Sequence, residues 1–316
     1  MEGIPFAKLQ EAAEGLSTHY RSARPTSTLP IISRYKAAAY LATRMPGTYA
    51  AAMHVLAETA QRLPAIETVL DLGAGTGAAS LACQSVFGSE VRLSLLDDDS
   101  ALFGEAKAIL PDATFIQTDL ATKKDLPDAD LVILGYCLGE LSETDRTTVL
   151  ERAWNASLKG LVIIEPGTSP AFSRILLMRD LLLKLGGHLA APCPNSQACP
   201  IQSPDWCHFA QRVERSAIHR RLKQGTMGYE DEKFSYLVFS KTPLEPVPGR
   251  IVRRPVHKPR LIEICVCQEQ KIRVQCITKK DKNQFRAARH ANWGDAWAGD
   301  GKSRSSDFVG YNLKES

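Results

Sequence analysis

The sequence predicts an α/β fold in which helices precede a parallel sheet, a cysteine-rich insertion interrupts it, and a small β-containing part ends the chain. From Glu67 onward, short apolar strands alternate with longer helical segments, a pattern typical of βαβ units. A loop rich in Pro and Cys breaks this pattern near residue 190. Five prolines between residues 241 and 260 then separate the sheet from a last group of strands.

The elements follow in order along four regions. Residues 1–64 show the apolar spacing of amphipathic helices. Residues 65–242 form the α/β domain, with the insertion at about 190–210; strands are expected at 67–73, 91–97, 113–119, 129–138, 159–167 and 233–241, and helices at 76–87, 100–110, 144–157 and 170–187. Residues 243–298 form a C-terminal part with two strands between 260 and 280 and a basic helix over 283–297. Residues 299–316 are expected to be a disordered tail.

The length and the terminal sequence restrict the class of protein. A chain of 316 residues, 44% of them hydrophobic, can bury a proper core without crosslinks. Its first residues, MEGIPFAKLQEAAEGL, carry acids and no apolar run behind a basic patch, so neither a secretory signal nor a transit peptide is expected. No apolar stretch approaches the ~18 residues of a membrane span. We expect a cytoplasmic protein, or a mitochondrial-matrix protein if the chain is eukaryotic, whose eight cysteines stay reduced.

The net charge of +4 hides an asymmetry. Residues 1–170 hold 14 Lys and Arg against 21 Asp and Glu, a balance of −7, whereas residues 171–316 hold 25 against 14, a balance of +11. A basic half is the electrostatic footprint of a nucleic acid or another anionic partner. The alternative is a basic surface without a partner.

The strongest nucleotide-binding signal is a glycine-rich run that directly follows a strand and opens a helix. It contains Gly73, Gly75 and Gly77, which let the backbone approach a ligand closely and present amides at a helix N-terminus. With Ala78 it also fits GxGxxA, so a dinucleotide-binding unit is an alternative. Asp71, before the first glycine, favours a ligand with an ammonium group over a pyrophosphate.

Two further acids end the next strands. Asp97 ends the second strand, where a carboxylate can bind both ribose hydroxyls, and Asp119 ends the third, where it can accept from an adenine amino group. This arrangement resembles the Rossmann-like sheet of class I methyltransferases, which implies S-adenosylmethionine as cofactor. A glycine-rich turn with ordinary surface acids remains the alternative.

The end of the fourth strand carries no signal for base methylation. Methylation of an exocyclic base nitrogen uses an Asp/Asn-Pro-Pro-aromatic run at this place. The chain has residues 134–141, LGYCLGEL, instead. We interpret Cys137 as a core cysteine rather than a nucleophile toward a pyrimidine ring. Catalytic residues therefore stay unassigned.

Three cysteines, Cys193, Cys199 and Cys207, lie close together in the proline-rich loop, separated by five and seven residues. In a reducing compartment they suit a soft metal or an iron–sulfur cluster. The spacing differs from the CxxC pairs of zinc ribbons, which disfavours zinc, and the loop is too polar for core cysteines. Candidates for a fourth ligand are Cys265, Cys267, Cys276 and, for zinc, His208.

With these motifs the chain resembles the Rsm-twenty-two family of methyltransferase-like proteins of the small ribosomal subunit. The resemblance runs from about Tyr40 to Trp297. It rests on the stretches YLATRMPGTYAA, VLDLGAGTGAAS, IIEPGTSPAF, PCPNSQACP, WCHFAQRVER, YEDEKFSYLVFSK and ARHANWGDAW.

The resemblance implies a protein that binds the small subunit and its rRNA during assembly. We expect this protein to be monomeric off the ribosome and to have no membrane contact. The resemblance also implies a [4Fe–4S] cluster, with zinc as the alternative, held by Cys193, Cys199, Cys207 and a distant fourth cysteine that Cys265 matches best. Phosphate contacts are expected from a helix after Cys207 and from the later lysines, namely Arg212, Arg215, Arg220, Arg221, Lys223, Lys279, Lys280 and Lys282.

Three functions fit these expectations. The first is an assembly factor that also methylates rRNA. The second is a ribosome-binding protein with an inactive methyltransferase fold. The third is a methyltransferase with a non-ribosomal substrate, which the basic half disfavours.

Overall fold

The computed structural model describes residues 4–21, 34–122, 125–299 and 305–307. Its helices are α1 Phe6–Arg21, α2 Arg34–Thr43, α3 Met45–Arg62, α4 Ala78–Phe87, α5 Ser100–Ile109, the 3-10 helix η1 Leu138–Glu140, α6 Glu143–Ala156, α7 Ser169–Lys184, α8 Ala217–Leu222 and α9 Lys282–His290. Its strands are β1 Thr68–Leu72, β2 Arg92–Asp97, β3 Thr114–Gln117, β4 Ala129–Gly135, β5 Ser157–Pro166, β6 His188–Ala191, β7 Phe209–Glu214, β8 Tyr229–Ser240, β9 Arg250–Ile251, β10 Val256–Lys258, β11 Leu261–Gln268, β12 Lys271–Thr278 and β13 Ser305–Asp307.

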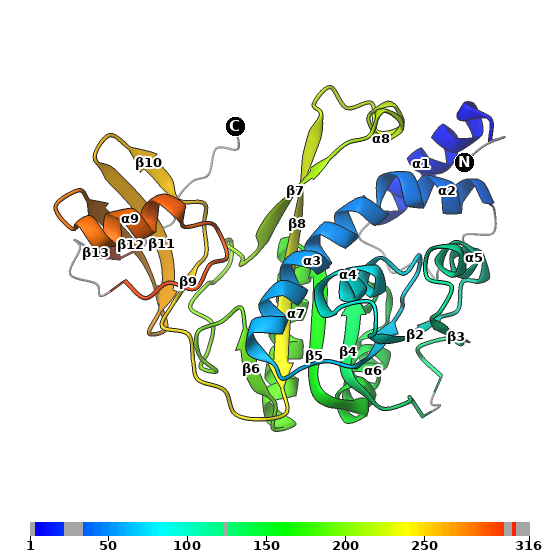
Figure 1. Cartoon of the computed structure of the whole chain (residues 1–316), viewed down its shortest axis with the longest axis horizontal. Helices are drawn as coiled ribbons and strands as arrows, with labels where there is room; N and C mark the ends of the chain where they lie inside the picture. The colour runs from blue at the N-terminus through cyan, green and yellow to red at the C-terminus, as the bar shows by residue number, and fades with distance from the viewer. Residues whose placement is uncertain (1–3, 22–33, 123–124, 300–304, 308–316) are drawn as a thin grey trace.

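The main sheet has the order β3-β2-β1-β4-β5-β8-β6, and β7 also pairs with β8. The strands β1 to β5 are mutually parallel, whereas β8 runs antiparallel to β5, β6 and β7. The predicted Rossmann-like α/β sheet is therefore confirmed, and the sheet is mixed rather than wholly parallel. The chain reaches β8 from α8 at the tip of the β7–β8 hairpin, so β8 returns alongside β5 in the opposite direction (Figure 1).

Helices cover both faces of this sheet (Figure 1). Strand residues alternate between the two faces, as the pleat requires. Val69 and Leu131 pack into the apolar layer beneath α3, α4 and α5, while Leu70 and Val132 pack into the layer beneath α6 and α7. Three of these helices have an N-cap side chain that accepts from backbone amides of the first turn. The caps are Asp99 at α5, Ser142 at α6 and Thr168 at α7.

The order of the sheet sets where a ligand can bind. From β1 the chain proceeds outward to β2 and β3, and then returns to β4 on the other side of β1. In open α/β sheets, ligands bind at the carboxyl ends of the strands beside such a switch point. The loop after β1 is therefore the expected cofactor position.

The C-terminal part is a second, five-stranded sheet with α9 packed on it (Figure 1). The expected pair of strands between 260 and 280 is β11 and β12, joined by a tight turn at Glu269 and Gln270. The expected basic helix is the shorter α9, which ends at His290. Of the expected tail at 299–316, Gly299 and Ser305–Asp307 are described, the latter as β13 against β12, and the remainder lies outside the described residues.

The prediction of a helix directly after Cys207 is wrong. Residues Phe209–Glu214 form strand β7, which pairs in register with β8 from Tyr229 to Phe234. Only the short α8 at the hairpin tip is helical, and it lies against α1 and α2.

Candidate functional site

The glycine loop lies between β1 and α4 at the switch point. Gly73, Gly75 and Gly77 have φ values of 70°, 54° and 75°, which favour glycine. A Cβ on Gly73 would also lie 2.5 Å from the Cβ of Cys137. Glycine is therefore required here both by the backbone and by the space.

Asp71 is turned into the protein rather than toward a ligand. The side chain is buried. Its Oδ2 accepts two hydrogen bonds from Ser80, one from the backbone amide at 3.1 Å and one from the hydroxyl at 2.7 Å. Burial raises the pKa of Asp71 to about 6, against the lowering effect of these bonds. The carboxyl group thus anchors the first turn of α4 and shapes the loop indirectly.

Asp97 ties the end of β2 to the loop. Its Oδ2 accepts from the amide of Gly75 at 2.7 Å, and its Oδ1 accepts from the amide of Asp99 at 2.9 Å. Burial raises the pKa of Asp97, with the two backbone bonds opposing it. Asp119 follows β3 along the same edge, is exposed, and accepts from the amide of Ala121. The structure thus brings Asp97 into contact with the glycine loop and leaves Asp119 at the rim.

The carboxyl edge holds further polar groups that the sequence motifs do not indicate. Tyr136, after β4, has a φ of 61°, and its hydroxyl donates to Oε1 of Glu232 on β8 at 3.1 Å. Glu165 is fully buried at the end of β5 and pairs with Arg174 at 2.8 Å. Burial raises the pKa of Glu140, in η1, to about 7, with a contribution from nearby acids. The rule that found Asp97, an acid at a strand end, would also have found Glu165, whereas Glu232 depends on the antiparallel β8.

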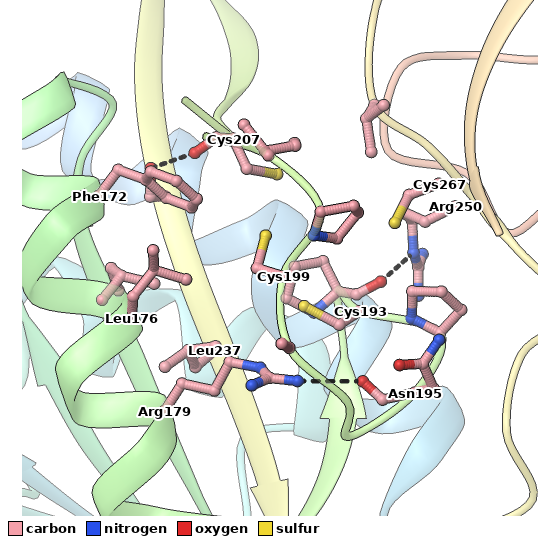
Figure 2. Close-up of a pocket in the computed structure, with 18 of the residues that line it drawn as sticks. Phe172, Leu176, Arg179, Cys193, Asn195, Cys199, Cys207, Leu237, Arg250 and Cys267 are labelled. Atoms are coloured by element: carbon pink, nitrogen blue, oxygen red, sulfur yellow. Dashed lines mark hydrogen bonds between the residues drawn. The ribbon is translucent and has the colours of Figure 1, made fainter. Parts of the chain in front are cut away.

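The cysteine loop between β6 and β7 contributes to a second site, a cavity of about 40 Å³ between α7, β8 and the C-terminal part (Figure 2). Four cysteines line it, Cys193, Cys199, Cys207 and Cys267. Burial raises the pKa of each thiol, to about 12 for Cys267. The three predicted loop cysteines therefore share one cavity with a thiol from a distant strand.

The cysteine that lines the cavity from the distant strand is Cys267, whereas the expected Cys265 does not line it. Cys267 pairs across the strands with Arg250, whose Nε donates to the carbonyl of Pro192 at 2.7 Å, directly before Cys193. Cys265 lies two residues earlier on β11, among the charges of Arg253 and Asp205, and outside the residues that line the cavity.

The remaining candidates for a fourth ligand also lie elsewhere. Cys276, on β12, pairs across the strands with Glu263 on β11. His208 stacks on Trp206 and packs edge-on against Trp293, and burial lowers its pKa to about 4.

The predicted metal-binding insertion is not supported by the structure. Among the described residues, no group of three or more His, Cys, Asp or Glu side chains is arranged so that it could hold a metal ion. The loop is held instead by two buried arginines, Arg179 and Arg250, which donate to its carbonyl groups.

Most of the expected phosphate contacts on the β7–β8 hairpin are already paired. Arg212 pairs with Asp231 at 2.9 Å, while Arg215 and Lys223 both pair with Glu230 at 2.9 Å. The guanidinium of Arg221 lies 4.0 Å from the ring centre of Phe6. Arg220 on α8 and the lysines beside α9, which are Lys279, Lys280 and Lys282, are also exposed.

In the part of the chain that the structure covers, no helix has both the length and the apolar character needed to cross a bilayer.

The profile of the family described as "Mitochondrial small ribosomal subunit Rsm22" matches residues 34–298, which include both sites. The chain belongs to the Rsm22 family. The resemblance seen in the sequence motifs is thereby confirmed.

Curated relatives of this Rsm22 chain match over part of their length. It is 29% identical to "Ribosome assembly protein METTL17, mitochondrial" of Homo sapiens, over 81% of this chain and 61% of that protein. It is 26% identical to "Rsm22-cox11 tandem protein 2, mitochondrial" of Schizosaccharomyces pombe, over 85% of this chain and 44% of that protein. Both are named as mitochondrial, so the expected cytoplasmic location finds no support among them.

Among solved structures, this Rsm22 chain is similar to an O-methyltransferase family protein from Burkholderia thailandensis. The two chains are 13% identical, with a TM-score of 0.46, over 75% of this chain and 70% of that one.

Proposed function

We propose that this chain is an assembly factor of the small ribosomal subunit that binds S-adenosylmethionine at the Gly73–Gly77 loop. The observation that carries the proposal is the family match over residues 34–298, since it spans both the loop and the cysteine cavity. The name of the human relative, a ribosome assembly protein, supports the ribosomal role. The names of both relatives support a mitochondrial location.

The carboxyl edge of the sheet fits the proposed cofactor. The glycine loop supports a close approach of the ligand, and Asp97 retains lone pairs for ribose hydroxyls beside its two backbone bonds. Acids also crowd this edge, at Glu140, Glu165 and Glu232. Such an edge favours the positive sulfonium and ammonium groups of S-adenosylmethionine over the pyrophosphate of a dinucleotide.

Calorimetry with S-adenosylmethionine tests this site. Asp97→Ala removes a charged acceptor and releases the glycine loop, so affinity is expected to fall about 10- to 100-fold. Asp98→Ala, at the exposed neighbouring position, is the matched control and should bind as the wild type does. Equal affinities for all three proteins, or no binding by the wild type, would contradict the assignment.

A second candidate is a ribosome-binding protein that holds the cofactor without transferring its methyl group. The observation that favours it is Cys137, whose Sγ donates to the carbonyl of Leu72 at 3.2 Å. Burial raises the pKa of this thiol well above its usual value, which makes it a poor nucleophile. Incubation of small-subunit particles with methyl-labelled S-adenosylmethionine separates the candidates, because label in rRNA requires turnover.

The cysteine cavity supports a second part of the proposal, a [4Fe–4S] cluster held by Cys193, Cys199, Cys207 and Cys267, with zinc as the alternative. Four thiols from two distant segments are the donor set that such clusters use. Bound there, the cluster would crosslink the loop to β11. The chain's own contacts between these segments, such as Arg250 to Pro192, already hold the two sides together.

Anaerobic purification with iron and sulfide analysis tests the cluster. Absorption near ~400 nm, where thiolate-to-iron transitions lie, is expected for the wild type and is lost in Cys267→Ser. Cys265→Ser, two residues away on the same strand, is the matched control and should keep the absorption. Stoichiometric zinc without sulfide would establish the alternative, and loss of colour in the Cys265 variant alone would refute the choice of Cys267.

For the rRNA contact, the exposed lysines beside α9 are the best candidates, because the hairpin arginines are mostly paired. Phosphate contacts predict binding that weakens steeply with salt. Co-sedimentation with small-subunit particles across a salt series is the test. Absence of binding at low salt would favour a non-ribosomal substrate.

A further inference from the structure

Arg179, on α7, is a buried cation beside the cysteine cavity (Figure 2). Its side chain is only 3% exposed, and it lies among the thiols rather than at the surface. It opposes the rise that burial causes in the pKa of Cys193, through both its charge and a hydrogen bond. Its charge acts in the same direction on the pKa of Cys199 and Cys267.

The charge of Arg179 has little compensation within the protein. Its only ion pair among the described residues is with its neighbour Asp180, at 3.4 Å, and the Asp180 side chain is 63% exposed. Its guanidinium also donates to the backbone carbonyls of Asn195, at 3.3 Å, and Gln197, which are neutral groups. Its Nε is buried and has no hydrogen-bond partner within the described part of the chain. A buried cation in such a setting is costly unless an anion lies beside it.

Arg250, the other buried arginine of the cavity, provides the contrast. Each of its donor nitrogens has a partner, and Glu58 neutralises its charge at 2.7 Å. The uncompensated positive charge of the cavity is therefore that of Arg179.

We propose that Arg179 is the counter-charge of an anionic centre formed by the four cavity thiolates, and that it thereby tunes the reduction potential of that centre. The inference rests on the proposed cluster. A cluster with four thiolate ligands is negative, and reduction by one electron adds a further negative charge. A fixed cation nearby stabilises the reduced form more, and so raises the potential. Through Asn195 and Gln197 the same side chain also holds the loop that carries Cys193 and Cys199.

Two substitutions separate the charge from the hydrogen bonds. Arg179→Gln removes the charge and keeps a donor, whereas Arg179→Lys keeps the charge and loses the planar guanidinium. Lys184→Gln removes an exposed charge from the same helix and is the matched control. Each protein is purified anaerobically, checked for iron, sulfide and circular dichroism, and titrated with dithionite while electron paramagnetic resonance reports the reduced cluster.

At the wild-type midpoint potential, the ratio of reduced to oxidised cluster in Arg179→Gln is expected to fall at least tenfold, which is about 59 mV for one electron. Arg179→Lys and Lys184→Gln should stay within threefold of the wild type. Loss of the cluster from folded Arg179→Gln alone also supports the counter-charge.

The outcomes that overturn the inference differ from those that overturn the cluster. A full cluster in Arg179→Gln with an unchanged midpoint refutes the role of Arg179 and leaves the cluster standing. Loss of the cluster from folded Arg179→Lys as well as Arg179→Gln refutes charge as the cause. A wild-type protein without iron and sulfide refutes the cluster itself, and the counter-charge with it.

Discussion

Replacing Arg250 with Met should strongly destabilise this protein, because one buried side chain holds three separate segments together. Arg250 is 1% exposed. Its nitrogens donate at 2.7 Å to Glu58 on α3, to the carbonyl of Pro192 in the cysteine loop and to the carbonyl of Gly294 after α9. The substitution keeps much of the apolar stem and removes all three bonds at once.

The expected loss follows from these contacts. Breaking a buried ion pair costs about 3–5 kcal/mol, and the lower end applies because the Glu58 side chain is 18% exposed and can regain water. Each carbonyl left without its donor adds about 1 kcal/mol. The free energy of unfolding should therefore fall by about 5 kcal/mol, and the melting temperature by about 10 °C at about 2 °C per kcal/mol.

Urea unfolding followed by circular dichroism measures the change. The matched comparison is Arg253→Met, which removes an ion pair of similar length, 2.5 Å to Asp205, but with the carboxylate side chain 36% exposed. Pairs open to solvent contribute about 0–1 kcal/mol. The carbonyl of Val252, which also loses its donor, adds about 1 kcal/mol, so this variant should lose about 2 kcal/mol. Equal losses in the two variants would show that burial does not govern the cost, and would refute the reasoning.

Three further predictions concern the hairpin, the glycine loop and the basic face. Burial raises the pKa of Glu230, but hydrogen bonds from His219, Lys223 and Arg215 outweigh it and hold the pKa well below 4.5. The carboxylate therefore contributes stability above pH 4.5 that is lost on acidification, and the gap in unfolding free energy between wild type and Glu230→Gln should narrow from pH 7 to about pH 3.5. Gly73→Ala should lose S-adenosylmethionine binding and about 1–3 kcal/mol of stability, from its positive φ and its contact with Cys137, whereas Gly104→Ala, with open space in α5, should lose neither by calorimetry and urea unfolding. The triple replacement of the α9 lysines with Ala should flatten the salt dependence of rRNA binding by about 2–3 units of slope, and Arg212→Ala should not, because Asp231 already pairs with Arg212; these lysines are Lys279, Lys280 and Lys282.

The order and type of the sheet elements could be predicted from the sequence because the relevant signals are local. The alternation of Val69 and Leu70, and of Leu131 and Val132, between two apolar layers is visible as continuous apolar runs bounded by turns. Each run is followed by a helix whose cap, such as Asp99 or Ser142, is also local. Such elements need no information from distant parts of the chain.

Local sequence signals could not decide features that depend on partners far away along the chain. Residues 209–214 form a strand because β8 pairs with them along their whole length, which local spacing does not reveal. Cys265 and Cys267 lie on the same face of β11, so alternation cannot choose between them. The pairing of Cys267 with Arg250 places Cys267 nearer to the cysteine loop, because Arg250 donates to the carbonyl of Pro192 beside Cys193.

The two candidate sites are joined through elements that contact both. On β8, Glu232 accepts from Tyr136 at the carboxyl edge, and three residues further along, Ser235 donates to the carbonyl of Cys207 at 2.8 Å. The indole of Trp206 donates to the carbonyl of Gly167 at 3.0 Å, directly after β5, which ties the cysteine loop to the same edge. The cysteine loop is therefore hydrogen-bonded to β8 and to the residue that follows β5. Because these connections are hydrogen bonds of the protein alone, they would link the sites whether or not the methyl group is transferred.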